Sequence, residues 1–347
     1  MSSLVSGIFY LTPHLKSRYI LIAMAALRES ILPNPELVDL RTVTGRELDP
    51  VLLEETVEWQ TDLDWDFGRS ADLIRQYADL RALTGHALID AGEVVGYAYS
   101  VLEEHKGLVG DVYVRPPWRG TESALRLLRS ALYSLMENPQ VRRIESQLML
   151  VSPQIGRVLE HEGRVRIFER MLMTLGGGPE PVLAESARRL RFVFEPWADQ
   201  WIEMAAETIM LAYVGHADSA INDQYRSAWG ARRFLQNIVQ YPGCGNFYRP
   251  GSQVGFDSET GTIAGVVLTS FVAPGVGHVT QLCVAPRVKG NGLGFELLRR
   301  AMAALRAGGA RQISLTVTCG NDAAIRLYQR CGFRERRRFL AYTWDRQ

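Results

Sequence analysis

The sequence predicts a mixed α/β (α+β) protein made of two similar domains in tandem. Strand-like and helix-like segments alternate along the chain, a pattern typical of sheets covered by helices. Residues 278–307 predict a strand, a glycine-rich turn and a helix in succession, and residues 109–136 repeat this order. The repetition at two places in the chain indicates an internal repeat of one folding unit.

The second copy of the repeat is the more regular. Residues 280–284 alternate between two faces and are rich in β-branched side chains, which predicts a strand. Pro286 ends this strand, because proline has no N–H for a sheet ladder. Residues 295–307 then place leucine and alanine at helical spacing, so a helix with one apolar face follows the turn.

The glycine-rich turn predicts an anion site. Gly290, Gly292 and Gly294 let the backbone approach a bulky anion, and Lys289 adds a cation. The first N–H groups of a helix have no partner inside it and lie at the positive end of its dipole, so a pyrophosphate is the expected guest. A Walker loop would need Gly-Lys-Ser/Thr where Gly294 is followed by Phe295, and the acidic residue of a dinucleotide-binding unit is missing from the end of the next strand.

Two motifs in the second half carry a family resemblance. The strand and turn contain Val284-x-Pro286-x-x-Lys289-Gly290-x-Gly292-x-Gly294, which resembles the acetyl-CoA signature of the GNAT superfamily of N-acetyltransferases. Lys289 stands where that family usually has Arg or Gln. Downstream, Asn321 opens the segment NDAAIRLYQRCGF, which resembles the second family motif with Leu-Tyr before Gly-Phe. The resemblance implies two tandem GNAT-like domains, each a mixed, mostly antiparallel twisted sheet flanked by helices, with acetyl-CoA as co-substrate.

Length, charge and cysteine content exclude other classes. The 347 residues suit two domains, and 39 Lys plus Arg against 38 Asp plus Glu give no reason to expect a nucleic-acid or membrane partner. The four cysteines have no C-x-x-C spacing, which favours free thiols in a reducing compartment and no metal. We therefore expect a cytoplasmic protein, a monomer or homodimer, and the family resemblance implies that it acts on a small-molecule or peptide amine.

Residues 1–36 are expected to form an N-terminal extension. Their apolar run, Tyr19–Leu27, is too short to span a bilayer, and no convincing signal-peptide cleavage site follows it. Whether residues 1–23 belong to the native chain stays open.

Residues 37–178 are expected to form the first GNAT-like domain. Strand patterns lie at 38–44, 87–89, 94–102, 109–114 and 143–149, and helical patterns at 47–60, 70–80, 124–136 and 153–160. The repeat aligns Arg119-Gly120 with Lys289-Gly290, but Glu122 takes the place of Gly292. A carboxylate there opposes a pyrophosphate, and no tyrosine follows near Leu159, so this domain is expected to be degenerate and non-catalytic. A working site in this domain is the alternative.

Residues 187–347 are expected to form the catalytic domain, after a turn-rich linker at 176–181. Its first strand is predicted at 190–194, helices at 198–213 and 224–239, and two further strands at 252–256 and 262–271. Residues 216–223 form a polar interruption between the helices. Tyr225, Arg226 and Trp229 follow it, in a region that lies beside the acceptor pocket in the family, and we expect them to be either substrate-binding residues or ordinary core and surface residues.

The resemblance also assigns roles in acyl transfer. The backbone of Leu282, Cys283 and Val284 is expected to pair with the pantetheine arm and to supply an N–H to the thioester oxygen. The pyrophosphate is expected to lie on Lys289, Gly290, Asn291, Gly292, Leu293 and Gly294, with Asn321 as a further cofactor contact. Tyr328 is expected near the sulfur as general acid, and its alternative role is that of a buried aromatic between helix and sheet.

The general base is the least determined role. His278, at the start of the strand, is a weak candidate, since an imidazole titrates near neutral pH. Asp257 and Glu259 are weaker candidates, and a water relay without a dedicated base is equally open. Cys283 could act as a nucleophile. The resemblance implies direct attack by the amine without an acyl-enzyme, so no catalytic role is expected for the Cys283 thiol.

The expected function is therefore an acetyl-CoA-dependent N-acetyltransferase whose C-terminal domain acetylates a primary amine by direct attack. One alternative keeps the fold without turnover, as an acyl-CoA-binding sensor. A second alternative is an acetyltransferase similar to the mycothiol synthases, which share the tandem layout with a degenerate first half.

Overall fold

The computed structural model describes residues 35–119, 122–161, 163, 165–176, 184–185, 191–241 and 245–346. Residues 1–34 with the apolar run Tyr19–Leu27, Gly120, Cys244 and most of the predicted linker lie outside the described residues. Below, the N-terminal half means residues 35–176 and the C-terminal half means residues 191–346.

The N-terminal half alternates strands with helices as the sequence predicts. Its strands are β1 (Glu36–Asp39), β2 (Thr84–Asp90), β3 (Glu93–Glu103), β4 (Lys106–Val114), β5 (Arg143–Leu148) and β6 (Arg166–Gly176), and its helices are α2 (Gly45–Glu58), α3 (Gly68–Asp79), α4 (Ser123–Glu137) and α5 (Pro153–His161). A capping box begins α2, because Thr44 and Glu47 each bond the other's backbone N–H.

The C-terminal half repeats this order with an additional short helix. Its strands are β7 (Phe192–Pro196), β8 (Asn246–Phe247), β9 (Gln253–Asp257), β10 (Ile263–Ala273), β11 (Val276–Val284), β12 (Gln312–Thr318) and β13 (Arg334–Asp345), and its helices are α6 (Ile202–Tyr213), α7 (Ala217–Ile221), α8 (Ala228–Gln240), α9 (Leu293–Ala307) and α10 (Asp322–Arg330). A 3-10 turn, η7 (Asp223–Arg226), links α7 to α8.

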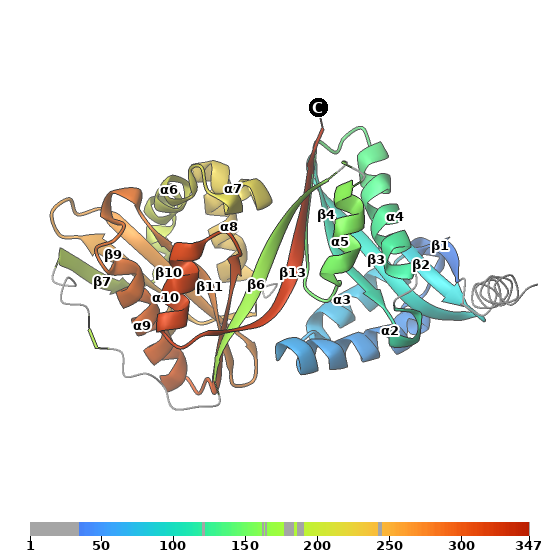
Figure 1. The fold of residues 1–347 in the computed structure, drawn as a ribbon, viewed down its shortest axis with the longest axis horizontal. Coiled ribbons are helices and arrows are strands. Elements are labelled where there is room, and N and C mark those ends of the chain that lie inside the picture. The colour runs from blue at the N-terminus through green and yellow to red at the C-terminus, as the bar shows by residue number, and fades with distance from the viewer. Residues whose placement is uncertain are drawn as a thin grey trace, which may run out of the picture.

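One 13-stranded sheet runs through both halves, in the order β1-β2-β3-β4-β5-β13-β6-β12-β11-β10-β9-β7, with β8 paired to β10 (Figure 1). Among the described strands, only the pairs β4–β5 and β11–β12 are parallel. Helices α9 and α10 cover one face of the C-terminal half, and α6 and α8 cover the other. These findings confirm the predicted fold class of mixed, mostly antiparallel sheets flanked by helices.

The final strands of the two halves join the sheets. β13 lies between β5 and β6, and β6 lies between β13 and β12, so each half contributes a strand beside the other half's sheet. Arg170 of β6 stands opposite Thr318 of β12, for example, and Leu340 of β13 opposite Leu148 of β5. The pairing covers sheet edges that would otherwise stay open. The domain boundary at residue 178 stays a prediction. Strands from both sides of this residue are hydrogen-bonded in one sheet.

Each half contains the same irregularity at its parallel strand pair. In the register of β10 with β11, Thr280 is an extra residue between Gln281 and Val279, and in β3 with β4 the extra residue is Gly110. Such bulges increase twist and bend a strand away from its neighbour. β11 correspondingly pairs with β12 only as far as Val279, and β4 with β5 only as far as Val109. Both halves therefore open beside the last residues of the bulged strand.

Several elements differ from the sequence prediction. β1 ends at Asp39, because the Asp39 carboxylate accepts the Arg41 N–H at 2.8 Å and starts a 3-10 turn where the strand was expected to continue to residue 44. The polar interruption contains α7, and the helix predicted from 224 begins at Ala228, where the Ser227 hydroxyl caps it. β6 was not predicted.

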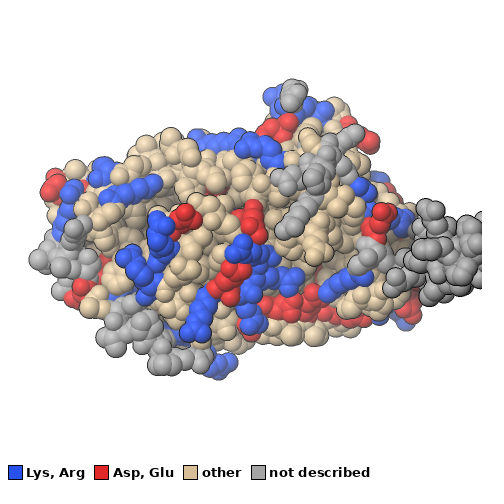
Figure 2. All heavy atoms as spheres, in the orientation of Figure 1, with Lys and Arg blue, Asp and Glu red and all other residues tan. Residues whose placement is uncertain are grey.

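The surface agrees with the balanced charge. Figure 2 shows Lys and Arg interspersed with Asp and Glu on the face that carries α10, β6 and β13. Arg338 illustrates the pattern, since it pairs with both Glu169 and Glu335. Among the described helices, none has the length and apolar character that a membrane crossing requires.

Candidate active site

A cavity of about 740 Å³ lies where β11 separates from β12. The end of β11, the turn before α9, the first turn of α9 and the exposed side of α10 form its walls. The residues that line it are Ala212, Tyr213, His216, Leu282, Cys283, Val284, Val288, Lys289, Gly290, Gly292, Leu293, Gly294, Phe295, Asn321, Ala323, Ala324, Leu327, Tyr328 and Arg330. We call this cavity the cleft.

The turn at the mouth of the cleft requires glycine at two positions. Gly290 and Gly292 have φ of 80° and 79°, a conformation that side chains with a Cβ rarely adopt. A Cβ on Gly290 would meet nothing within 4 Å, so the backbone conformation and not crowding demands the glycine there. α9 begins directly after Gly292 without a side-chain cap, so its first N–H groups face the cleft without a helical partner.

The turn is also positively charged. The ammonium of Lys289 and the guanidinium of Arg330 line the cleft and make no side-chain hydrogen bond or ion pair within the described residues. No Asp or Glu stands among the described lining residues. With the open N–H groups of α9, this arrangement suits an anion with several oxygens, such as a pyrophosphate.

The inner end of the cleft lies along the unpaired edge of β11. Past Val279 this strand keeps its pairing with β10 on one side and has no described strand on the other. Its backbone groups at Leu282 to Val284 are therefore available to an extended ligand, which would add to the sheet edge as a strand does.

Tyr328 reaches the cleft from α10. The residue is buried, with 8% of its surface exposed, and its ring packs edge-on against Phe333 with 6.1 Å between centroids. Burial raises the pKa of Tyr328, and the nearby Asp218 carboxylate raises it further. The phenol consequently holds its proton at neutral pH. Asn321 lines the cleft beside it and caps α10, with its Oδ1 accepting the Ala324 N–H at 3.2 Å.

The structure brings the predicted cofactor residues together with one exception. Leu282, Cys283, Val284, Lys289, Gly290, Gly292, Leu293, Gly294, Asn321 and Tyr328 all line the cleft. Asn291 does not line the cleft, and its backbone N–H donates to the Val288 carbonyl at 3.3 Å. Burial raises the pKa of the Cys283 thiol to about 12, so this sulfur stays protonated and is a poor nucleophile.

His278 does not reach the cleft. It is buried, its Nδ1 lies 2.8 Å from the Ser314 hydroxyl, and its ring packs edge-on against Trp65 at 4.9 Å. Burial lowers its pKa to about 3, which keeps the imidazole neutral. The extra residue at Thr280 turns His278 to the sheet face opposite Leu282. The base role predicted for it therefore has no geometric support.

The predicted acceptor residues separate into two places. Tyr225 stacks on the cleft residue Tyr213, with 4.3 Å between centroids, and its hydroxyl lies 3.5 Å from the Gln281 amide oxygen. Arg226 donates to the Ser219 carbonyl at 2.7 Å. Trp229 is 60% exposed and lines a different cavity, described below. Of the three, only Tyr225 adjoins the cleft.

The sequence analysis did not single out several lining residues, among them Tyr213, His216 and Arg330. Tyr213 receives a hydrogen bond from the Gln281 amide at 3.2 Å, and burial raises its pKa. The His216 Nδ1 accepts the backbone N–H of Asp218 at 3.1 Å, so the neutral ring carries its proton on Nε2. Asp218 in turn accepts a hydrogen bond from the Thr318 hydroxyl at the end of β12. For His216, the sequence signal was the His-x-Asp spacing of His216 and Asp218 within the polar interruption at residues 216–223.

Comparison with known proteins agrees with this geometry. Residues 218–333 match the Acetyltransferase (GNAT) family. The chain is 30% identical over 259 residues to a mycothiol acetyltransferase of Thermobispora bispora, which covers 71% of this chain and 78% of that relative. A mycothiol acetyltransferase of Saccharopolyspora erythraea is 40% identical over 72 residues, or 21% of this chain and 24% of that relative.

Solved structures share the fold at low sequence identity. A GCN5-related N-acetyltransferase from Sphaerobacter thermophilus has a TM-score of 0.64 and 17% identity, over 89% of this chain and 95% of that one. A tandem GNAT protein from the clavulanic acid biosynthesis pathway has a TM-score of 0.57 and 17% identity, over 90% of this chain and 98% of that one. These likenesses concern the fold, and they extend through both halves.

Proposed function

The chain belongs to the GNAT family of acetyltransferases, and from this premise we propose that its C-terminal half transfers an acetyl group from acetyl-CoA to the primary amine of a small molecule. One observation carries the proposal. The separation of β11 from β12 places a glycine turn, an unpaired strand edge and a protonated tyrosine along a single cleft.

Along the cleft, successive groups of residues suit the pyrophosphate, the pantetheine arm and the acetyl group of acetyl-CoA. The first N–H groups of α9, with Lys289 and the glycines of the turn, suit the pyrophosphate. The free edge of β11 at Leu282 to Val284 suits the amide groups of the pantetheine arm. Tyr328 and His216 then lie at the acyl end, where a thioester makes its acetyl carbon available to a nucleophile.

Acyl transfer requires stabilisation of the carbonyl oxygen, protonation of the leaving sulfur and removal of a proton from the amine. A backbone N–H of the β11 edge donates to the carbonyl oxygen as negative charge develops on it. The Tyr328 hydroxyl donates its proton to the departing sulfur and regains one from water; because the pKa of Tyr328 is raised, the phenol is protonated in neutral solution before the reaction. The attacking amine loses its proton to water, because the described lining has no carboxylate. Direct attack needs no acyl-enzyme, in keeping with the high pKa of Cys283.

A narrower candidate for the acceptor has a specific observation in its favour. Both relatives named above are mycothiol acetyltransferases, and one aligns over 78% of its own length. Under this candidate, the acceptor is the amine that acetylation converts into mycothiol. Of the three predicted acceptor residues, we keep Tyr225 as a proposed acceptor contact, because it stacks on the cleft residue Tyr213, whereas Arg226 and Trp229 do not adjoin the cleft.

The test is acetyl-CoA binding by titration calorimetry, followed by thiol release with a panel of primary amines. We expect one site per chain. In Gly292→Glu, which copies the Glu122 of the other half, the Kd should rise about 100-fold or more, because a like charge facing the pyrophosphate costs several kcal/mol. Gly309→Glu is the matched control: Gly309 also has positive φ, at 91°, but it lies in the turn after α9, away from the cleft.

The outcomes separate the alternatives. No binding to the wild type contradicts the acetyltransferase proposal. Binding without thiol release on any amine favours the acyl-CoA sensor. An equal loss of affinity in Gly292→Glu and Gly309→Glu would show that backbone strain and not the carboxylate is responsible.

A further inference from the structure

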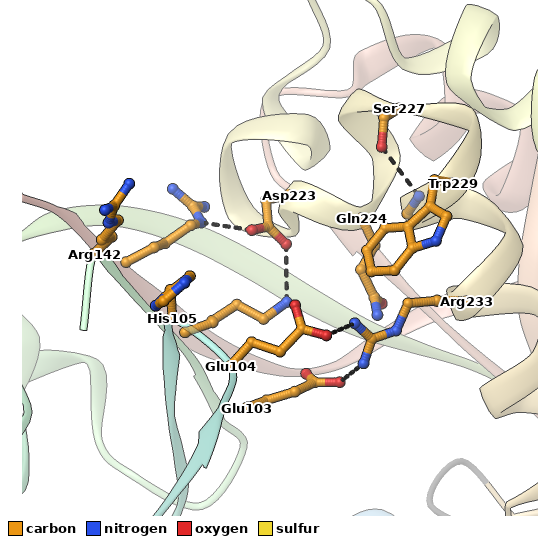
Figure 3. A pocket seen from close by; sticks show the side chains of 12 residues that line it. Glu103, Glu104, His105, Arg142, Asp223, Gln224, Ser227, Trp229 and Arg233 are labelled. Carbon is orange, nitrogen blue, oxygen red and sulfur yellow. Dashed lines mark hydrogen bonds and ion pairs between the residues drawn. The ribbon is translucent and has the colours of Figure 1, made fainter. Parts of the chain in front are cut away.

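The two halves meet at a polar contact near a second cavity of about 250 Å³. This cavity shares no lining residue with the cleft. The cavity lies between the β3–β4 turn with the start of β5 on one side, and η7 with the first turn of α8 on the other (Figure 3). Figure 3 shows Asp223 pointing into it from η7, toward side chains of the N-terminal half.

Three charged side chains of the N-terminal half surround Asp223. The Lys106 Nζ lies 2.8 Å from the Asp223 carboxylate and 3.5 Å from that of Glu145. Glu145 accepts the backbone N–H of Asp223 at 2.8 Å and the Arg143 Nε at 2.6 Å. Both the side chain and the backbone of Asp223 are therefore held. We call Lys106, Arg143 and Glu145 the clamp.

The clamp also reaches α7. The Arg143 Nη2 donates to the Ala220 carbonyl at 2.5 Å, while its Nη1 pairs with Asp345 at 2.7 Å. The clamp side chains of Arg143, Glu145 and Lys106 are only 7%, 10% and 13% exposed. Charges buried to this degree hold each other in one geometry, and the loss of one partner leaves another uncompensated.

The other end of α7 belongs to the cleft. His216 caps α7 and lines the cleft beside Tyr328, and Asp218 binds the Thr318 hydroxyl at the end of β12. α7 spans five residues, too short to hold a position through its own hydrogen bonds. Contacts at its two ends therefore determine where His216 and Asp218 lie.

We propose that the N-terminal half takes part in acetyl transfer through the clamp, with Lys106, Arg143 and Glu145 acting as positioning residues that hold α7 and η7 so that His216 and Asp218 stay at the acyl end of the cleft. The inference rests on the proposed function of the cleft. It gives the half that lacks the cofactor motifs a specific task, which is to determine how fast a bound substrate reacts and not how tightly acetyl-CoA binds.

The test compares Lys106→Met with Arg233→Met. Arg233 lines the same cavity and pairs with Glu103 and Glu104 across the same contact, but it lies on α8 and makes no hydrogen bond or ion pair to α7 within the described residues. Both changes remove one cation and keep a long apolar side chain. Asp223→Asn is a second clamp variant, since it removes the charge from the other partner and retains the N–H that Glu145 accepts.

Two readouts are measured on the full chain. Hydrogen exchange of the peptide 214–226 reports whether α7 and η7 are held, and we expect its amides to exchange about tenfold faster or more in Lys106→Met and Asp223→Asn. In the same variants kcat should fall about tenfold or more with an unchanged Kd for acetyl-CoA, because a displaced active-site group costs rate more than cofactor affinity. Lys106→Arg should restore most of the rate.

The results distinguish the inference from the proposed function. If the wild type releases no thiol from acetyl-CoA, the proposed function fails, while hydrogen exchange still decides whether the clamp holds α7. If Lys106→Met and Asp223→Asn leave exchange and kcat as in wild type, the clamp has no positioning role. If Arg233→Met loses as much activity as Lys106→Met, general loosening of the contact explains the effect and the inference is overturned.

Discussion

The two halves of the sheet share a backbone arrangement and differ in what occupies it. β4 and β11 both contain an extra residue before their last four positions, and both lose their parallel neighbour at that point. Beside β11 the opening is the cleft. Beside β4 the guanidinium of Arg119 bonds the Val114 carbonyl at 2.6 Å, pairs with Glu58 and lies 4.9 Å over the Tyr113 ring.

The helices that follow the openings differ in the same sense. α9 starts after Gly292 at φ 79°, whereas α4 starts after Glu122 at φ −68°, with a carboxylate and a Cβ at the helix end. α10 carries Tyr328, and α5 contains no tyrosine. The fold therefore provides the opening in both halves, while a few residues of the turn and the helix determine whether the opening suits an anionic ligand.

The largest effect is expected from removal of the Tyr328 hydroxyl, which has no counterpart on α5 of the N-terminal half. In Tyr328→Phe we expect kcat to fall about 100-fold or more, the usual range for loss of a positioned general acid, with little change in the Kd for acetyl-CoA. Steady-state thiol release and calorimetry measure the two quantities.

Tyr342→Phe is the control for that change. Tyr342 is also buried, and its hydroxyl has no hydrogen-bond partner among the described residues, so its removal should leave kcat within about twofold. A wild-type rate in Tyr328→Phe would assign Tyr328 to packing alone. The leaving sulfur would then take its proton from water.

Most of the cleft could be predicted because its signal is local. The glycines at 290 and 292 are required by backbone angles within one turn, and Asn321 is a helix cap whose partner lies three residues away. Such features are written in short stretches of sequence. For this reason the residues predicted to bind the cofactor, apart from Asn291, all line one cleft.

The features that were missed depend on distant parts of the chain. β6 has its partners in β12 and β13, far along the chain, so no local pattern indicates that the two halves join there. His278 and Leu282 would share a face of a regular strand, since they are four residues apart, but the bulge at Thr280 reverses the alternation. His216 lines the cleft as the residue that caps α7, and α7 is joined to the distant β12 through Asp218 and Thr318.

A second prediction concerns the strand position that follows the bulge. This position is Asp111 in the N-terminal half and Gln281 in the C-terminal half. Asp111 is buried beside Glu55, and burial raises the pKa of Asp111 from 3.8 to about 6. A raised folded-state pKa means that the native state favours the protonated acid. Its contribution to stability is thus complete below pH about 4 and is lost as the pH rises through about 6.

Asp111→Asn imitates the protonated acid and should remove this dependence. Relative to wild type, the variant should gain up to about 3 kcal/mol in unfolding free energy between pH 4 and 7, at 1.36 kcal/mol per pKa unit. Denaturant titrations at several pH values measure it. Asp257→Asn is the matched variant in the C-terminal half. Because the Arg191 guanidinium lowers the pKa of Asp257, the unfolding free energy of this variant should differ from that of wild type by the same amount throughout pH 5 to 7. A constant difference for Asp111→Asn as well would show that Asp111 is ionised in the native state.

The smallest expected effect concerns the opening beside β4. Arg119→Met removes the guanidinium from the opening beside β4 and leaves Glu58 without its partner. It should cost about 1 kcal/mol of stability, the size of one hydrogen bond with a half-exposed ion pair. Calorimetry should still find one acetyl-CoA site per chain, because Glu122 continues to oppose a pyrophosphate at the start of α4. A second site in Arg119→Met would mean that the arginine alone closes the N-terminal half. The difference between the halves would then lie in one side chain, and Gly292→Glu would be expected to leave that second site intact.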